Sequence, residues 1–355
     1  MGDQACSGED TGQAINGVVM RTGAARGQEG HFHEAGFYRS DAEFAALIVP
    51  FAEEGIAAGE PVILGYDERK SALLRSWLTD PSAAEFIGDE RLYAKPARAI
   101  AAYRRLFEFH LAMGAGQIRI AGDVPHPGNG GRFEGWDRYE AAVNTVWQDF
   151  PVWGRCLYDT TTAPAAVLEV VERTHPCIVS PSGQRRESGR YQPSRAFEGL
   201  PYAPDPLEGT APVAELVNRP AAEARHTLAR IADGRIPATI ATDLLIGATE
   251  AVTNARRHGR PPVTVCIWAA PGHVVVTVHD TGPGPADRLA GLIPPPSTQD
   301  QHLGMGLWIT HQLDLDVTLR YASDGFTVRL RHLPRSSRPA ATTGPPDGPP
   351  RPRPA

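Results

Sequence analysis

The sequence predicts two domains of different fold class, an α/β domain with a parallel sheet followed by an α+β domain. The chain has 355 residues, and its 41% apolar content allows two sizeable cores. In the first part of the chain, helix-like and strand-like segments alternate, which is typical of a parallel sheet covered by helices on both faces. In the second part, two helices precede a run of strands joined by short turns, which favours helices packed on an antiparallel sheet.

The first domain is expected over residues 28–180, after an arm (1–27) that lacks hydrophobic periodicity. A helix is predicted where a capping residue such as Ser40 or Asp41 precedes a periodic segment and a glycine such as Gly59 follows it. Short apolar runs are predicted to be strands buried on both faces. The helices predicted in this way are 41–58, 68–78, 97–113, 133–148 and 163–173, and the strands are 61–65, 117–121, 153–158 and 177–179.

The second domain is expected over residues 211–333. It follows a segment, 181–210, that is rich in Ser, Gly, Pro and Arg and is predicted to be an interdomain linker. The Pro-rich tail, 334–355, is expected to be disordered. The helices predicted in the second domain are 220–232, 241–258 and 305–313, and the strands are 263–268, 273–279, 317–321 and 326–330.

Composition excludes several classes of protein. The formal net charge of −6 argues against direct DNA binding, which usually needs a basic field. No run of 18 apolar residues is present, so no membrane-spanning helix is expected, and the acidic N-terminus is not a secretory signal peptide. The four cysteines are scattered without metal-ligand spacing, which suits a protein of the reducing cytoplasm.

The predicted helix 241–258 carries a polar stripe beside its apolar one. Glu250, Asn254 and Arg257 recur at positions i, i+4 and i+7 and lie about 120° from the apolar stripe. Taken alone, this stripe is more typical of a solvated helix face than of a site.

Two glycine motifs follow this helix in the sequence. The strand 273–279 ends directly in Asp280, and Gly282 and Gly284 come next, so a carboxylate acceptor lies beside a backbone that a ligand can approach closely. Gly304 and Gly306 then open a helix, where backbone N–H groups are free for phosphate oxygens. Each motif is weak alone, but the three elements in this order are much more specific.

Together, Glu250-x-x-x-Asn254, Asp280-x-Gly282-x-Gly284 and Gly304-x-Gly306 resemble the Asn box and the two glycine boxes of the GHKL ATP-binding superfamily. The resemblance covers about 211–333, and the stretches 250–258 and 304–309 look most like the anti-sigma-factor serine kinases. It implies a GHKL (Bergerat) ATP-binding sandwich with ATP and Mg²⁺ as cofactors.

The resemblance also implies a role for each motif residue. Asn254 would ligate Mg²⁺, Asp280 would accept the adenine amino group, and Arg257 would lie near the phosphates. The lid backbone that wraps the nucleotide would rely on the four motif glycines, Gly282, Gly284, Gly304 and Gly306. The sequence departs from the family in two places: the lid (285–303) contains three consecutive prolines, and Thr327 is displaced from the place of the Thr that often supports the adenine-binding Asp.

Glu250 is the expected catalytic residue. A Glu one helical turn before the Mg²⁺-binding Asn can act as the base for an attacking hydroxyl or water. Histidine kinases usually lack this Glu, and no helix of the H-E-x-x-[ST]-P type presents an acceptor histidine, because His175 and His226 both lie in unsuitable contexts. An autophosphorylating histidine kinase is therefore disfavoured.

The first domain lacks an intact P-loop. The segment after strand 61–65 keeps Lys70-Ser71 but has no second glycine, and Asp67 and Glu68 would repel phosphate, so a plain strand–turn–helix connection is favoured. The domain instead resembles the MEDS sensory domain, a RecA-like module without its phosphate loop, over about 28–180. The matching residues are Gly30-His-Phe-His33, Phe37-Tyr38, Pro50-Phe51, Gly55, Gly59, Asp137-Arg-Tyr-Glu140 and Cys156-Leu-Tyr-Asp159.

The MEDS resemblance implies that the first domain senses a small organic molecule. The cleft residues expected are His33, Asp123, His126 and Tyr139, and Asp123 follows a strand at the sheet edge where such folds bind ligands. The pair His31 and His33 has no other metal ligand nearby in the sequence, so zinc is not predicted.

The leading hypothesis is a cytoplasmic signalling protein in which the sensory domain controls an Mg-ATP-dependent kinase. Its expected partner is a STAS-type anti-sigma-factor antagonist, which it would phosphorylate on Ser or Thr. The same domain is also expected to sequester a sigma factor. Two alternatives stay open, an ATP-gated binding module without catalysis and a histidine-kinase-like protein acting on an acceptor in trans. An active site in the first domain is least favoured, and the oligomeric state, a homodimer included, is left open.

Overall fold

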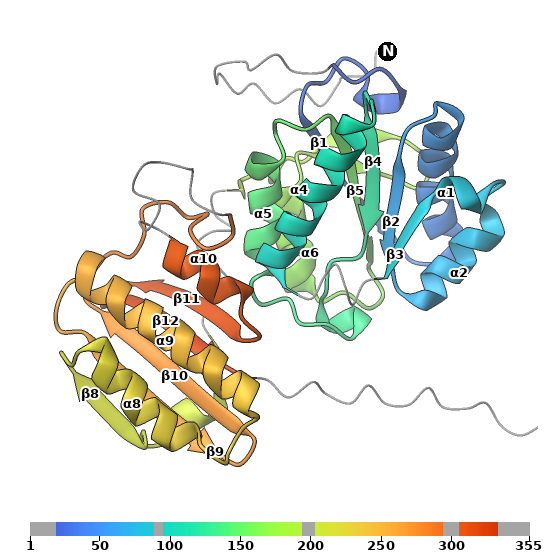
Figure 1. Cartoon of the computed structure of the whole chain (residues 1–355). Helices are drawn as coiled ribbons and strands as arrows, with labels where there is room; N and C mark the ends of the chain where they lie inside the picture. The colour runs from blue at the N-terminus through green and yellow to red at the C-terminus, as the bar shows by residue number, and fades with distance from the viewer. Residues whose placement is uncertain (1–18, 89–94, 194–202, 294–304, 333–355) are drawn as a thin grey trace, which may run out of the picture.

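A computed structural model describes residues 19–88, 95–193, 203–293 and 305–332 (Figure 1). Two sheets organise the chain, one of seven strands and one of five. Figure 1 shows each sheet with its own helices, and α10 of the second domain faces α4 and α5 of the first. Within the described residues, every helix is too short or too polar to cross a bilayer.

The first sheet has the strand order β3-β2-β4-β5-β1-β6-β7, and all neighbours are parallel except β6 and β7. Parallel neighbours need crossover connections, and helices supply most of them. The strands are β1 (His31–Tyr38), β2 (Val62–Tyr66), β3 (Glu85–Gly88), β4 (Ile118–Gly122), β5 (Val152–Asp159), β6 (Cys177–Val179) and β7 (Arg185–Glu187).

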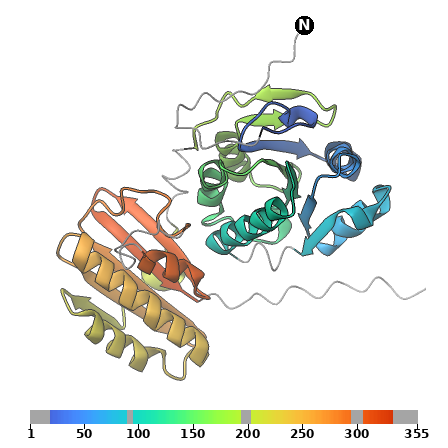
Figure 2. The same ribbon diagram turned by 45° about the horizontal axis from the view of Figure 1, so that its top comes forward.

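Helices cover both faces of this sheet (Figure 2). One face carries a core rich in aromatic residues from α4 and α5, including Tyr103 and Phe107, and the other carries a core that includes Phe44 and Trp153. The predicted α/β domain with a parallel sheet is therefore confirmed. Its helices are α1 (Asp41–Ala57), α2 (Glu68–Trp77), α4 (Pro96–Ala112), α5 (Trp136–Val146) and α6 (Ala165–Thr174), with short 3-10 turns at Gly23–Ala25, Pro81–Ala83 and Pro127–Asn129.

The domain extends beyond its expected limits at both ends. Met20 and Ala25, from the expected arm, are buried in the core that contains Phe44. Strand β7 lies inside the expected linker and pairs antiparallel with β6. Its sequence, Arg-Arg-Glu, shows no periodicity because an edge strand of three residues buries almost nothing, so this part of the linker prediction is wrong.

The second sheet is antiparallel throughout, in the order β11-β12-β10-β9-β8. Two long helices, α8 and α9, pack on one face over a core of Val, Leu, Ile and Ala side chains. This arrangement confirms the predicted α+β sandwich. Its elements are 3-10 turn Pro206–Gly209, β8 (Ala214–Val217), α8 (Ala221–Ala232), α9 (Ala238–His258), β9 (Thr264–Ala270), β10 (His273–Asp280), α10 (Met305–Gln312), β11 (Asp316–Ala322) and β12 (Gly325–Arg331).

Candidate functional site

Helices α9 and α10 bring the first and third sequence motifs together. Gly306, in the first turn of α10, is buried against the polar stripe of α9. A Cβ atom added at Gly306 would lie 2.3 Å from Glu250 Oε2 and 3.2 Å from Asn254 Nδ2. Only a residue without a side chain allows these two helices to approach so closely, and the approach places a carboxylate and an amide side by side.

Asp280, at the end of β10, is held by backbone groups. The residue is 3% exposed, and Oδ1 accepts hydrogen bonds from the N–H of Gly282 at 2.7 Å and of Arg260 at 3.0 Å. A Cβ atom at Gly259, the residue after α9, would lie 2.4 Å from this carboxylate. Oδ2 has no hydrogen-bond partner among the described residues, so one oriented acceptor is left for a ligand.

These residues fit Mg-ATP. The spare carboxylate oxygen of Asp280 suits an exocyclic amino donor such as that of adenine. The amide oxygen of Asn254 is a ligand of the kind that Mg²⁺ prefers. Sequence reasoning missed Gly259, whose only signal was its place as the predicted end of a helix.

The remaining motif residues lie at different depths. Gly284 has a φ of +72°, and a Cβ atom there would lie 2.5 Å from the ring of Phe326. Arg257 is exposed on the last turn of α9. Thr327 does not lie opposite Asp280, because Phe326 is the residue of β12 that pairs with Asp280. Thr327 pairs instead with His279, and its hydroxyl lies 3.0 Å from His279 Nδ1. Gly304 and the three prolines of the lid lie outside the described residues.

The described beginning of the lid, residues 285–293, contacts the first domain. Arg138 of α5 donates to the carbonyl oxygen of Arg288 at 2.7 Å and, at 3.4 Å, to that of Ala290. Leu292 is 2% exposed and belongs to the aromatic core of the first domain. The first domain therefore holds the chain directly before residue 294.

The chain after the lid is held as well. Lys95 and Arg98, at the start of α4, donate to the carbonyl oxygen of Gln312, the last residue of α10, and to those of Leu313 and Leu315 just after it. Cations at a helix C-terminus are favourable because the carbonyl groups there carry partial negative charge. Burial, and then the neighbouring Arg98, lower the pKa of Lys95 to about 8.

A third contact joins Glu134, just before α5, to the face of the second sheet opposite α8 and α9. Its carboxylate accepts from Arg329 and Arg331, each at 2.5 Å, and from the Thr318 hydroxyl at 2.7 Å. Arg331 also pairs with Asp205 and Asp316. These charges are compensated within one network, so the two domains share a polar interface as well as the apolar contact of the lid.

The four expected cleft residues of the first domain have different neighbours. Asp123 forms an ion pair with Lys70, whose neighbour Ser71 donates to the carbonyl oxygen of Tyr66, as expected for a plain connection without a phosphate loop. His126 Nδ1 accepts from the N–H of Gly128, and its ring lies 5.9 Å from that of Tyr158. Burial, and then Lys70, lower the pKa of His126 to about 4.

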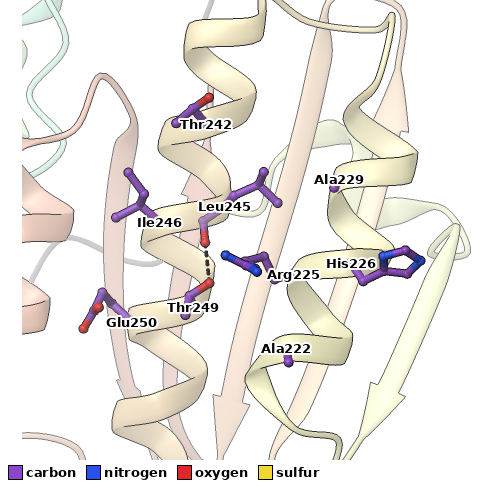
Figure 3. A pocket seen from close by; sticks show the side chains of 9 residues that line it. All are labelled: Ala222, Arg225, His226, Ala229, Thr242, Leu245, Ile246, Thr249 and Glu250. Atoms are coloured by element: carbon purple, nitrogen blue, oxygen red, sulfur yellow. Dashed lines mark hydrogen bonds between the residues drawn. The ribbon is translucent and has the colours of Figure 1, made fainter.

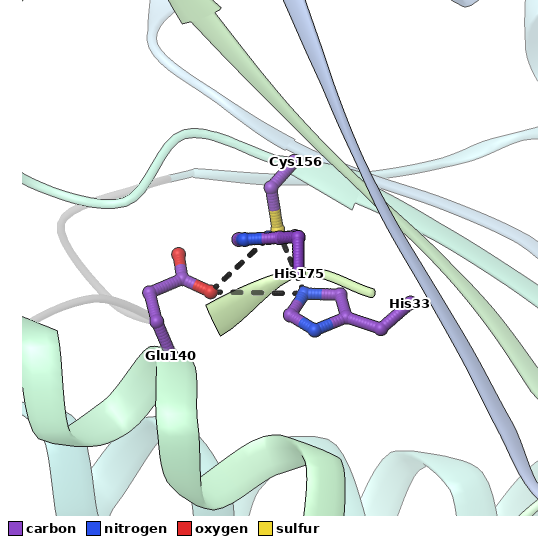
Figure 4. A group of neighbouring side chains, drawn as sticks. All are labelled: His33, Glu140, Cys156 and His175. Atoms are coloured by element: carbon purple, nitrogen blue, oxygen red, sulfur yellow. Dashed lines mark hydrogen bonds and ion pairs between the residues drawn. The ribbon is translucent and has the colours of Figure 1, made fainter. Parts of the chain in front are cut away.

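Tyr139 and His33 lie elsewhere in this domain. The ring of Tyr139 packs at 5.0 Å from that of Trp136, within the aromatic core. His33 lies with Glu140, Cys156 and His175, whose ligand atoms are all within 4.8 Å of one another (Figure 4). Sequence reasoning missed the last three as a group, because they come from distant parts of the chain.

A groove of about 620 Å³ lies between α8 and α9 and meets the motif residues only at Glu250 (Figure 3). Glu250 lies on its rim and points away from α8, whereas Arg225 points toward α9. Neither Asp280 nor any motif glycine lines it, so it is not the nucleotide site. The lining residues are Ala222, Arg225, His226, Ala229, Thr242, Leu245, Ile246, Thr249 and Glu250.

Family comparisons match the chain in two places. Residues 32–176 match the MEthanogen/methylotroph, DcmR Sensory (MEDS) domain, and residues 216–332 match the histidine kinase-like ATPase domain. The chain joins a MEDS domain to a histidine kinase-like ATPase domain. Both resemblances seen in the sequence, to a MEDS domain and to a histidine kinase-like ATP-binding domain, are thereby confirmed. A search of curated proteins finds no match.

Solved structures resemble the chain only in part. The RsbU and RsbW domains of Rv1364c from Mycobacterium tuberculosis are 21% identical, with a TM-score of 0.24, over 34% of this chain and 33% of that one. The blue-light activated histidine kinase EL346 of Erythrobacter litoralis is 19% identical, with a TM-score of 0.21, over 31% and 39%. The mycobacterial sensor histidine kinase MprB is 18% identical, with a TM-score of 0.21, over 34% and 95%. The chain thus spans about a third of the first structure, and the family assignment rests on the two domain matches.

Proposed function

We propose that the ATPase domain is a protein serine/threonine kinase of the anti-sigma-factor type, controlled by the MEDS domain. The observation that carries this proposal is the position of Glu250, whose Oε2 lies beside Gly306 and one helical turn from Asn254. A carboxylate in this position can accept the proton of an attacking hydroxyl group. A domain that only bound ATP would not need it.

Each residue of the site has a separate task in this mechanism. Asp280 accepts the adenine amino group, the glycines let the backbone close around the phosphates, and Arg257 adds positive charge near them. Asn254 would hold Mg²⁺, which would neutralise the charge that develops on the phosphates. The oxygen of the Ser or Thr hydroxyl attacks the γ-phosphorus, and Glu250 takes the proton of that hydroxyl. The bond between the γ-phosphorus and the oxygen that leaves with ADP breaks.

The contacts of the lid support control by the first domain. Arg138 holds the lid directly before residue 294, and Lys95 with Arg98 holds the end of α10 after it. Binding of a small organic ligand in the sensory domain would change the position of α4 or α5 and with it the lid. This route needs no contact between the sensed ligand and ATP.

The proposed partner is a STAS-type anti-sigma-factor antagonist that presents the acceptor Ser or Thr. The similarity of residues 250–258 to the anti-sigma kinases supports this choice. The same domain would bind a sigma factor, and we place the protein in the cytoplasm, without direct contact to DNA or membrane. In a second candidate function, ATP only gates the binding of the sigma factor, and in a third the acceptor is a histidine in trans.

Transfer of label from γ-labelled ATP to STAS proteins encoded by the same genome tests the proposal. Acid-stable label that Glu250→Gln loses, while ATP binding persists, is the expected result. Glu223→Gln, on the exposed face of α8, is the matched control and should leave transfer intact. ATP binding without any transfer would favour the gating function, acid-labile label would favour a histidine acceptor, and full transfer by Glu250→Gln would refute the assignment of the base.

A further inference from the structure

Four side chains with metal-ligating atoms meet inside the MEDS domain, away from the nucleotide site (Figure 4). His33 comes from β1, Glu140 from α5, Cys156 from β5, and His175 from the residue after α6. Glu140 and His175 are completely buried, and His33 is 2% exposed. The cluster therefore ties four elements together in the interior of the domain.

The spacing of the four atoms matches a tetrahedral metal site. His33 Nε2 lies 3.5 Å from Cys156 Sγ and 3.7 Å from Glu140 Oε2, and His175 Nε2 lies 3.5 Å from Glu140 Oε2. A zinc ion with bonds of about 2.0–2.3 Å separates its ligand atoms by about 3.3–3.8 Å. Three of the pairs are thus already at the separation that such an ion imposes.

The hydrogen bonds around the cluster orient the lone pairs of both histidines inward. Asn144 donates through Nδ2 to the carbonyl oxygens of Glu140 and Thr174, so its Oδ1 must accept from His33 Nδ1, at 3.0 Å. His175 Nδ1 donates to the carbonyl oxygen of Val171 at 2.9 Å. Each neutral ring therefore carries its proton on Nδ1, and each Nε2 offers a bare lone pair, as metal-binding histidines do.

The centre of the cluster lacks positive charge. Glu140 Oε2 and His175 Nε2 are buried without a hydrogen-bond partner among the described residues, and both atoms are acceptors when the carboxylate is ionised. Among the described residues, the ion-pairing neighbours of Glu140 are the two histidines alone, and its other oxygen, Oε1, accepts from the Tyr158 hydroxyl at 2.6 Å. Unpaired acceptors that face one another in a dry interior are costly unless a cation lies between them.

We propose that His33, Glu140, Cys156 and His175 bind a divalent transition-metal ion, with zinc as the resident ion, in a closed four-coordinate site. Two imidazoles, a thiolate and a carboxylate suit zinc rather than Mg²⁺ or Ca²⁺, which prefer oxygen ligands only. Because all four positions come from protein and the site is buried, the metal stabilises the domain and does not act on a substrate. This site goes beyond the proposed kinase function, which does not depend on it.

Metal content and cobalt spectroscopy of the full chain test the proposal. We expect about one zinc per chain in the purified protein, and a higher midpoint of thermal unfolding after refolding with Zn²⁺ than after refolding with a chelator. After refolding with Co²⁺, a thiolate-to-cobalt charge-transfer band should appear. Cys156→Ser should lose that band, and the control Cys266→Ser, in the other domain, should keep it.

Two further variants keep the test decisive if Cys156→Ser fails to fold. Asn144→Ala keeps all four ligands but removes the acceptor that orients His33, together with two hydrogen bonds to backbone carbonyl oxygens, and should lower zinc affinity about 10- to 100-fold. Glu140→Gln removes the charge without changing the shape and should bind zinc much more weakly than wild type. The proposal is overturned if the wild-type chain refolds without retaining zinc, or if Cys156→Ser keeps the cobalt band. It is also overturned if the wild-type chain is found to be metal-free and Glu140→Gln is more stable than it, since a proton would then occupy the site.

Discussion

Arg138→Ala should loosen the beginning of the ATP lid without unfolding either domain. The guanidinium of Arg138 lies on α5 of the MEDS domain and donates to two lid carbonyl oxygens, those of Arg288 and Ala290. The bond to Arg288 is short, at 2.7 Å, whereas that to Ala290, at 3.4 Å, is too long to add much. The effect therefore depends on one strong, charge-assisted hydrogen bond.

The expected magnitude follows from this geometry. A hydrogen bond to a charged group contributes about 1.5–3 kcal/mol, and water reaches the exposed Arg288 once the arginine is gone, which favours the lower end of that range. A change of 1.5–3 kcal/mol corresponds to roughly a 10- to 150-fold increase in local opening. Leu292 stays anchored in the aromatic core, so the lid should open more often without leaving the first domain permanently.

Hydrogen–deuterium exchange of the peptide 286–293 measures this opening. Three of its amides are hydrogen-bonded within the segment: Leu289 to the Asp287 side chain, Ala290 to the Asp287 carbonyl oxygen, and Leu292 to the Leu289 carbonyl oxygen. Their protection should fall in Arg138→Ala and stay unchanged in Arg173→Ala, which removes an exposed ion pair with Glu169 in the same domain. Unchanged protection in a folded Arg138→Ala chain would show that this arginine does not hold the lid.

Three other outcomes are expected. Gly306→Ala should fold but weaken ATP binding, because its Cβ atom would lie 2.3 Å from Glu250 Oε2. Adding Glu250→Ala should restore ATP binding but not transfer. Titration calorimetry measures ATP binding by both variants, and label from γ-labelled ATP measures transfer. Glu34→Gln should lower the free energy of unfolding by about 3 kcal/mol in urea melts, because it leaves the buried Arg155 without its partner. Burial would raise the pKa of Glu34, but Arg155 and Arg185 lower it below 4.5. The contribution of Glu34 to the free energy of unfolding is therefore complete above pH 4.5 and is lost as the pH falls through the lower folded-state pKa. An acid-unfolding profile that Glu34→Gln leaves unshifted would contradict this.

The elements that the sequence predicted are those with a local signal. Helix α1 begins directly after its capping residue Ser40, whose hydroxyl accepts from the N–H of Glu43, and strand β6 was predicted at its observed bounds, Cys177–Val179. Strands β3 and β8 were missed because each is a four-residue edge strand with little buried surface. Such strands are fixed by their neighbours in the sheet rather than by their own pattern.

Strand β7 shows the same limit for a charged segment. Its Arg185 pairs with the buried Glu34 of β1, more than a hundred residues away, at 2.9 Å. A sequence of three charged residues resembles a linker until that distant carboxylate is known. The partner, and not the local pattern, decides that the segment belongs to the first domain.

The candidate sites divide in the same way. The nucleotide motifs were recognisable because Glu250 and Asn254 lie one turn apart on one helix and Asp280 directly ends a strand. The cluster around His33 had no such signal, since its first and last residues, His33 and His175, are 142 positions apart and the four meet only after the sheet has formed. His33 was expected to contact a sensed ligand, and its neighbours now give a specific reason to test a metal there.

Helix α5 connects the lid to the interior of the MEDS domain. It carries Arg138, which holds the lid, and two residues later Glu140, which faces the buried cluster. Residues two positions apart point to nearly opposite sides of a helix, so a rotation or shift of α5 must move both contacts at once. Lys95 and Arg98 hold the end of α10 from a different helix, α4, and would keep that anchor while the lid moves. The arrangement therefore allows the MEDS domain to release the lid of the nucleotide site without separating the two domains.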